Sequence, residues 1–201
     1  MCNVMRLGIR AVYCEREGAM IKLTSPVDDE AVRSLRAGDT VLISGVVYTG
    51  RDAAHKRLCD LLANGENLPI DLNHGIIYYV GPTPAKPGRA IGSAGPTSSY
   101  RMDPYAEPLL QQGLKVMIGK GSRSPEFKQL LQKYGAVYLS AIGGAAASIS
   151  ECVRKCEVVT YEDLGAEAIH RLEVHNFFAI VTYDSVGNDL FEQGIAKYKK
   201  I

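Results

Sequence analysis

The chain contains 201 residues, of which 46% are hydrophobic, and this is enough for one large domain with a sizeable core. The formal net charge of +1 argues against a nucleic-acid-binding surface, because such surfaces are strongly basic. No apolar run is long enough to cross a bilayer, and residues 1–20 lack the zones of a signal peptide. We therefore expect a cytoplasmic protein that binds neither nucleic acid nor a membrane.

Local patterns predict that strands and helices alternate along the chain. Short apolar or β-branched runs predict strands at residues 20–24, 40–49, 75–81, 89–93, 115–118, 136–141, 156–160 and 178–184. Capping residues and helix stops predict helices at residues 28–36, 51–63, 104–112, 125–134, 144–155 and 189–199. Helices that link the middle strands favour parallel pairing in an α/β fold. We expect one domain at residues 19–201, preceded by a tail at residues 1–18 whose role is open.

The cysteines predict neither a disulfide framework nor a metal site. They are an odd set without CxxC spacing, namely Cys2, Cys14, Cys59, Cys152 and Cys156. Cys152 and Cys156 are four residues apart, so on a helix they would share one face. They could form half of a metal site, but two partly buried thiols on a packed helix are the simpler interpretation.

The loop from Gly95 to Pro104 combines several groups that can bind an anion. Its three successive hydroxyls belong to Thr97, Ser98 and Ser99. Arg101 can bind a carboxylate through two parallel hydrogen bonds, and the hydroxyls can donate to it or relay a proton. Asp103 is a good N-cap for a helix beginning at Pro104, whose first N–H groups lack partners within the helix. An ordinary capped turn with a solvated arginine is the alternative.

Two further segments share this layout of strand, basic loop and helix start. Arg51 follows the strand predicted at 40–49, and Lys120 follows the strand predicted at 115–118. Loops at the carboxyl ends of parallel strands meet at one edge of a sheet, so Arg51, Arg101 and Lys120 are expected to form one pocket for a small dianion. Asp52 and His55 lie close to Arg51 on the predicted helix. For His55, a role in the site and no role at all are equally good interpretations.

The glycine patterns of nucleotide-binding proteins are absent. The proline-rich loop at residues 81–88 lacks the GxxxxGK[ST] pattern, and the glycine- and alanine-rich run at residues 143–147 lacks GxGxxG. Close packing of a helix on the sheet explains the second run more simply.

Several motifs in order identify a family resemblance. They are GRDAAHKR at 50–57, the loop at 95–103, GKG at 119–121, GGAA at 143–146, YEDLGAEA at 161–168 and YDSVGND at 183–189. From about residue 20 onward, the chain resembles the β subunit, or C-terminal domain, of the class I fumarate hydratase and tartrate dehydratase family of iron–sulfur hydro-lyases. One departure is Ser98, since a second threonine often stands there in the family; serine keeps the hydroxyl.

The resemblance implies a swivelling β/β/α domain with three layers and a mixed or parallel sheet. It implies reversible addition of water across the double bond of a C4 dicarboxylate, as in fumarate to L-malate. In the family, a [4Fe–4S] cluster is held by cysteines of the α subunit or N-terminal domain. The chain would then be active only with an α subunit, as an α2β2-type heteromer, and isolated chains would form a β homodimer.

The resemblance also implies a role for each matching residue. Thr97 is expected to transfer the proton, activated by an acidic group of the partner chain, because a threonine hydroxyl alone is a poor base. The residues expected to bind the substrate are Arg51, Ser98, Arg101 and Lys120. Asp52, His55 and Ser99 are expected to lie behind these side chains.

Alternative functions remain at this stage. Within the family, the substrate could be L(+)-tartrate or mesaconate. In another class, the chain could be a non-catalytic carboxylate-binding regulatory module that uses the same pocket without a cluster.

Overall fold

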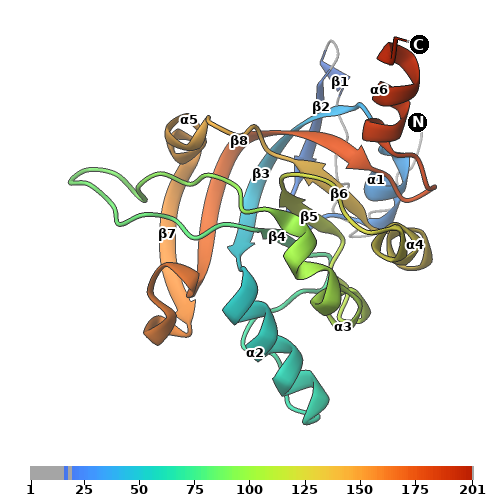
Figure 1. Ribbon diagram of the computed structural model, residues 1–201. Coiled ribbons are helices and arrows are strands. Elements are labelled where there is room, and N and C mark those ends of the chain that lie inside the picture. The colour runs from blue at the N-terminus through green and yellow to red at the C-terminus, as the bar shows by residue number, and fades with distance from the viewer. Residues whose placement is uncertain (1–15, 18–19, 201) are drawn as a thin grey trace, which may run out of the picture.

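The computed structural model describes residues 16–17 and 20–200, which form a mixed α/β fold (Figure 1). The strands are β1 (Arg16–Glu17), β2 (Met20–Thr24), β3 (Thr40–Thr49), β4 (Ile76–Tyr78), β5 (Val116–Gly119), β6 (Val137–Ser140), β7 (Val153–Thr160) and β8 (Ile169–Tyr183). The α-helices are α1 (Asp29–Ser34), α2 (Asp52–Ala63), α3 (Ala106–Gln111), α4 (Pro125–Tyr134), α5 (Ala146–Glu151) and α6 (Leu190–Tyr198). Two 3₁₀ segments are η1 (Ser99–Tyr105) and η2 (Glu162–Glu167).

The sheet contains a parallel part and an antiparallel part. Strands β2 to β6 pair in parallel in chain order, which confirms the predicted pairing of the middle strands. β8 pairs antiparallel with β3, β6 and β7. Because β8 contacts both β3 and β6, the sheet curls back on itself, and the antiparallel part covers one face of the parallel part.

Alternate residues of the parallel strands pack into two separate hydrophobic cores. Ile76 and Tyr78 of β4 face a core that they share with β3 and β8, whereas Ile77 and Tyr79 face a core beneath the helices. Successive side chains of a strand point to opposite faces, so this alternation places one core between the two sheet parts. In Figure 1, α2, α3 and α4 lie together on the other side. The layers are therefore sheet, sheet and helix.

Several predicted elements form with their predicted caps. The Asp28 carboxylate accepts from the N–H of Ala31 at the start of α1, and Ser124 Oγ accepts from the N–H of Phe127 at the start of α4. Gly135 ends α4 in the left-handed conformation, at φ 60°. Local capping chemistry thus determined these helix ends.

Two predicted elements are wrong, because their residues form other backbone contacts. The strand predicted at 89–93 is absent, because Gly92 and Ser93 pair with Thr83 of the same loop and not with the sheet. The helix predicted at 144–155 ends at Glu151, and residues 153–155 instead join the strand predicted at 156–160 to form β7, which pairs with β8. Cys152 and Cys156 therefore do not share a helix face, and no residue of α5 is buried.

The helix predicted to begin at Pro104 begins at Ala106, after the 3₁₀ segment η1. Asp103 does not cap it, because its carboxylate binds Arg123 and the N–H of Ser124 instead. The strand predicted at 178–184 is the end of β8, which is longer because β3, β6 and β7 pair along it.

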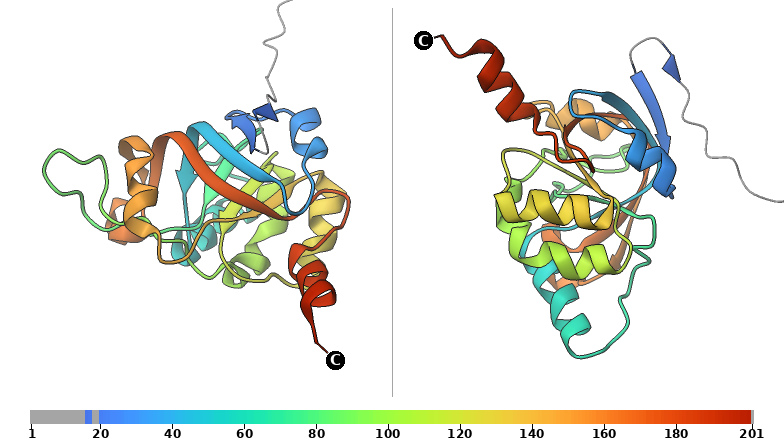
Figure 2. Two further views of the ribbon diagram at one scale, coloured as in Figure 1. Left: turned by 90° about the horizontal axis from the view of Figure 1, so that it is seen from above. Right: turned by 90° about the vertical axis from the view of Figure 1, so that its right-hand side faces the viewer.

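The predicted tail at 1–18 lies largely outside the described residues. Arg16 and Glu17, however, form β1 and pair antiparallel with β2, so the sheet begins before residue 19. Figure 2 shows two segments that project from the body, the loop after β4 and helix α6. Within the described part of the chain, no helix combines the length and apolarity needed to cross a membrane.

Candidate active site

Three loops meet near the carboxyl ends of β3, β4 and β5, although the strand predicted at 89–93, just before the middle loop, is absent. Gly50, after β3, donates its N–H to Tyr78 O at 3.1 Å, and Thr97 donates its N–H to Tyr79 O at 2.7 Å. Ser98 and Lys120 form a parallel β-bridge. These backbone contacts join the loops that carry Arg51, Arg101 and Lys120, and α2 begins directly below the end of β3 in Figure 1.

Asp52 brings two of the predicted cations together. Its Oδ2 lies 3.0 Å from Arg101 Nη2 and 3.4 Å from Arg51 Nε. Arg51 Nη2 also lies 3.5 Å from Glu167 Oε1. All four side chains are between 28% and 39% exposed, so the group lies at an open surface.

Gly81 makes room for Arg51. A Cβ atom at Gly81 would lie 2.9 Å from the Ala166 carbonyl oxygen and 3.3 Å from Arg51 Cδ and Nη1. The chain between β4 and the Thr97 loop therefore has to pass close to the Arg51 side chain, and only glycine permits this.

Ser99 lies behind the loops, as predicted, and ties them together. It is fully buried, and its Oγ accepts from the Lys120 N–H at 3.0 Å and from the Tyr138 hydroxyl at 3.0 Å. Ser99 Oγ donates to Thr97 O at 3.2 Å. A Cβ on Gly119 would collide with this oxygen, so the glycine before Lys120 serves the packing of Ser99. Thr97 and Ser98 are half-buried, and the Lys120 side chain is exposed.

His55 is buried below Arg51, on α2. Its Nδ1 lies 3.1 Å from Arg51 O, and its ring packs edge-on against Tyr79 at a centroid distance of 5.2 Å. Burial lowers the pKa of His55 to about 4, so the imidazole is neutral at pH 7. The residue supports the backbone at the start of α2, and its Nε2 has no hydrogen-bond partner among the described residues.

Sequence reasoning missed two residues of this region. Glu167 Oε2 accepts from the Ala53 N–H at 3.1 Å and so caps α2, which has no side-chain cap of its own. Arg123 is buried, binds Asp103 and stacks over the Phe127 ring at 3.4 Å. Glu167 is distant in sequence, so no local spacing could reveal it. For Arg123, the sequence offered one indication, namely that it is a second basic residue three positions after Lys120.

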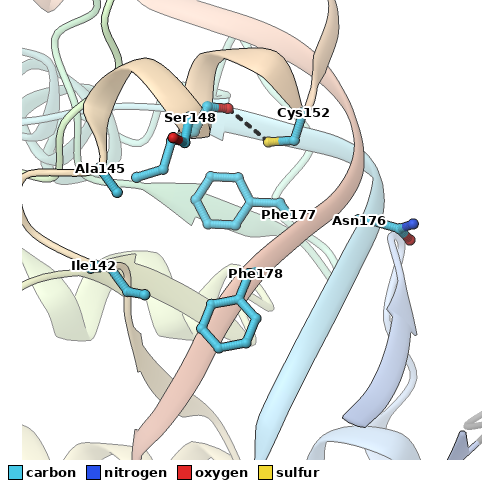
Figure 3. A pocket seen from close by; sticks show the side chains of 8 residues that line it. Ile142, Ala145, Ser148, Cys152, Asn176, Phe177 and Phe178 are labelled. Atoms are coloured by element: carbon cyan, nitrogen blue, oxygen red, sulfur yellow. Dashed lines mark hydrogen bonds between the residues drawn. The ribbon is translucent and has the colours of Figure 1, made fainter.

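A separate apolar cavity lies between α5 and β8 (Figure 3). Its volume is about 270 Å³, and the rings of Phe177 and Phe178 line it. Cys152 also lines it and donates its thiol to Ile149 O at 2.9 Å. None of the predicted site residues lines this cavity.

Comparison with known proteins assigns the family. The model of the fumarase C-terminus family matches residues 8–194, which also covers part of the predicted tail. The chain belongs to this family. Its relatives carry the names of hydratases and dehydratases, so the chain is a member of a hydro-lyase family.

Three relatives define the similarity more closely. The chain is 40% identical over 183 residues to the "Putative fumarate hydratase class I" of Geobacillus stearothermophilus, covering 89% of this chain and 35% of that protein. It is 36% identical to the "Fumarate hydratase class I, aerobic" of Salmonella typhimurium, covering 89% and 32%. It is 38% identical to the "Putative L(+)-tartrate dehydratase subunit beta" of Methanocaldococcus jannaschii, covering 85% and 91%. The chain thus spans about a third of the two fumarate hydratases.

Proposed function

We propose that the chain is the β subunit of a two-subunit hydro-lyase that reversibly hydrates fumarate to L-malate. The observation that carries the proposal is the shared contact of Arg51 and Arg101 with Asp52, beside the hydroxyl-rich loop at the ends of three adjacent strands. The three sheet and helix layers are consistent with a swivelling β/β/α domain, which we propose closes over the partner's half of the site.

The cations suit a C4 dicarboxylate. Arg51 and Arg101 lie close enough to share one carboxylate, and each guanidinium can form two parallel hydrogen bonds with a carboxylate. Lys120 is joined to Ser98 by the β-bridge and offers a third positive charge for the other end of the substrate. We propose that Ser98 hydrogen-bonds the same ligand.

Thr97 is the proposed proton-transfer residue. In the hydration direction, a hydroxyl adds to one alkene carbon and a proton goes to the other, and we assign that proton to the Thr97 hydroxyl. The hydroxyl is far from titrating at neutral pH, so an acidic group has to return a proton to the Thr97 oxygen, and this group takes up the proton that the attacking water loses. We propose that the α subunit supplies this group, because the site is open to solvent on this chain.

The described residues of this chain do not fit an iron–sulfur cluster. Residues 16–17 and 20–200 contain no group of three His, Cys, Asp or Glu side chains that could hold a metal ion. Burial also raises the pKa of the Cys59 and Cys152 thiols to about 11, which disfavours the thiolate form that a cluster needs. We assign the [4Fe–4S] cluster to the α subunit, in an α2β2-type complex.

A second candidate is the β subunit of L(+)-tartrate dehydratase. Its support is the 38% identity to the tartrate dehydratase relative, which is similar to the 40% identity to the first fumarate hydratase. Both substrates are C4 dicarboxylates and would use the same cations.

The test is anaerobic co-expression of this chain with a subunit that carries three separated cysteines, followed by assays on fumarate, mesaconate and L(+)-tartrate. We expect the highest kcat/KM with fumarate. A preference for tartrate or mesaconate would reassign the substrate. An assembled, cluster-loaded complex that turns over none of the three would favour a regulatory carboxylate-binding module.

A further inference from the structure

The site arginines are held by two carboxylates of the chain itself. Arg101 Nη2 and Arg51 Nε share Oδ2 of Asp52, and Arg51 Nη2 contacts Oε1 of Glu167. These contacts engage one nitrogen of Arg101 and two of Arg51, which are among the donors that would bind a carboxylate ligand. The groups that are proposed to bind the substrate are therefore already paired with groups of the same chemistry.

We infer that Asp52 and Glu167 compete with the substrate carboxylate for Arg51 and Arg101, and so set the affinity for the dicarboxylate. The inference rests on the proposed function, because it assumes that these arginines bind a carboxylate. In the unliganded state the two residues hold the arginines in place. On binding, the ligand carboxylate takes over these contacts.

The geometry of the contacts shows that they are exchangeable. Each contact joins one nitrogen to one oxygen, at 3.0 to 3.5 Å, and none is a paired, two-bond contact. Arg57, on the same helix, differs, since its Nη1 and Nη2 bind the two oxygens of Asp163 at 2.8 and 2.5 Å. Two-bond pairs are stronger and more directional than single contacts. A ligand carboxylate that forms such a pair with Arg101 can displace Asp52.

The charges explain why resident carboxylates are present. Arg51 and Arg101 lie together at the start of α2, where the helix dipole adds a partial positive charge. Without Asp52 and Glu167, the two guanidinium groups would repel each other in the absence of substrate. Arg51, Arg101 and Lys120 carry three positive charges, and Asp52 and Glu167 carry two negative charges, so one positive charge remains uncompensated. The site is therefore held together, yet it still attracts a dianion.

The experiment measures binding of succinate, a saturated C4 dicarboxylate, to the full chain by chemical-shift titration. The Asp52→Asn variant keeps the shape of the side chain and an oxygen acceptor but removes the charge. We expect it to bind succinate about two- to fivefold more tightly, the scale of a partly exposed ion pair. Glu167→Gln, whose amide oxygen can still accept from the Ala53 N–H, is expected to act in the same direction.

Two matched controls remove the same charge away from the arginines of the site. Asp60→Asn lies on the same helix and breaks the exposed Lys56–Asp60 pair, and Asp163→Asn lies in η2 beside Glu167. Equal tightening in Asp52→Asn and Asp60→Asn would reveal only a long-range charge effect and would overturn the inference. Unchanged or weaker binding of succinate by Asp52→Asn would also overturn the inference, because that is the result expected if Asp52 has only a structural role. The same holds if neither the original chain nor the variant binds succinate.

Arg101→Gln separates this inference from the proposed function. If Arg101→Gln weakens succinate binding but Asp52→Asn does not strengthen it, the carboxylate site is correct and the competition is not. If Arg101→Gln leaves succinate binding unchanged, the proposed carboxylate site itself is wrong.

Discussion

The carboxylate of Asp103 binds the buried guanidinium of Arg123, and this pair links two loops of the candidate site. Asp103 follows Arg101 in the hydroxyl-rich loop, and Arg123 follows Lys120 after β5. The other oxygen of Asp103 accepts from the Ser124 N–H at 2.9 Å. The Arg123 N–H in turn donates to the Tyr183 hydroxyl at 3.0 Å. The spacing of Arg101 and Lys120 therefore depends on a buried ion pair.

Arg123→Met should destabilise the chain by about 3–5 kcal/mol, the usual cost of removing one partner of a buried ion pair. The Asp103 carboxylate would remain largely buried without its cation. The measurement is the free energy of unfolding in urea. Lys133→Met is the control, because it removes one partner of an exposed pair with Glu107 and should cost less than about 1 kcal/mol. Similar losses for both variants would contradict this assignment.

Arg101→Lys should impair catalysis although it keeps the charge. A lysine cannot form the two parallel hydrogen bonds of a guanidinium with a carboxylate. The expected loss is about 1.5–3 kcal/mol in transition-state stabilisation, the scale of hydrogen bonds to charged groups. The measurement is kcat/KM for fumarate hydration by the assembled complex. Arg57→Lys, whose partner Asp163 lies outside the three loops, should leave kcat/KM nearly unchanged. An unimpaired Arg101→Lys complex would place Arg101 outside the substrate site.

Thr97→Val should lower kcat about 10²–10⁴-fold, the usual contribution of general acid–base catalysis. Substrate affinity should change much less, because Arg51, Arg101 and Lys120 still bind the carboxylates. Thr97→Ser keeps the hydroxyl and should retain substantial activity. Steady-state kinetics of the cluster-loaded complex measure both effects. If Thr97→Val raises KM and leaves kcat intact, the hydroxyl only binds substrate.

His55 should make the stability of the chain depend on pH between about 4 and 6.5. Its pKa is lowered from 6.5 to about 4 in the folded chain, so the unfolded chain binds the proton more strongly. Lowering the pH from 7 through 6.5 to 4 therefore costs stability, up to about 3 kcal/mol. His55→Gln should lack this part of the pH dependence, as measured by urea unfolding at pH 4.5 and 7.5. His175→Gln, at an exposed position, should follow the original chain. A His55→Gln profile parallel to the original would refute the buried, neutral imidazole.

The isolated chain should bind no iron–sulfur cluster. Its described residues offer no metal-binding group, and burial raises the pKa of its Cys59 and Cys152 thiols. Anaerobic reconstitution followed by iron analysis and visible absorption checks this, with the co-expressed complex as the positive control. A stoichiometric cluster on the isolated chain would move the ligands to this subunit.

The sequence alone determined the features that depend on neighbouring residues. Capping at Asp28 and Ser124, the stop at Gly135 and the interleaved helices predicted α1, α4 and the parallel pairing. The layout of strand, basic loop and helix start predicted Arg51 and Lys120 at one edge of the sheet, because loops after parallel strands share that edge. Arg101 reaches this edge although the strand predicted before its loop is absent.

The tertiary structure decided whatever depends on a residue far away in the chain. Pairing with β8 extended the strand predicted at 156–160 back to Val153, since cross-strand contacts outweigh local helix propensity. Asp103 binds Arg123 and therefore does not cap the following helix as expected. Glu167, which is 114 residues distant from Ala53, accepts from the Ala53 N–H and caps α2. No local spacing encodes these pairings, because they arise only when the folded backbone brings two loops together.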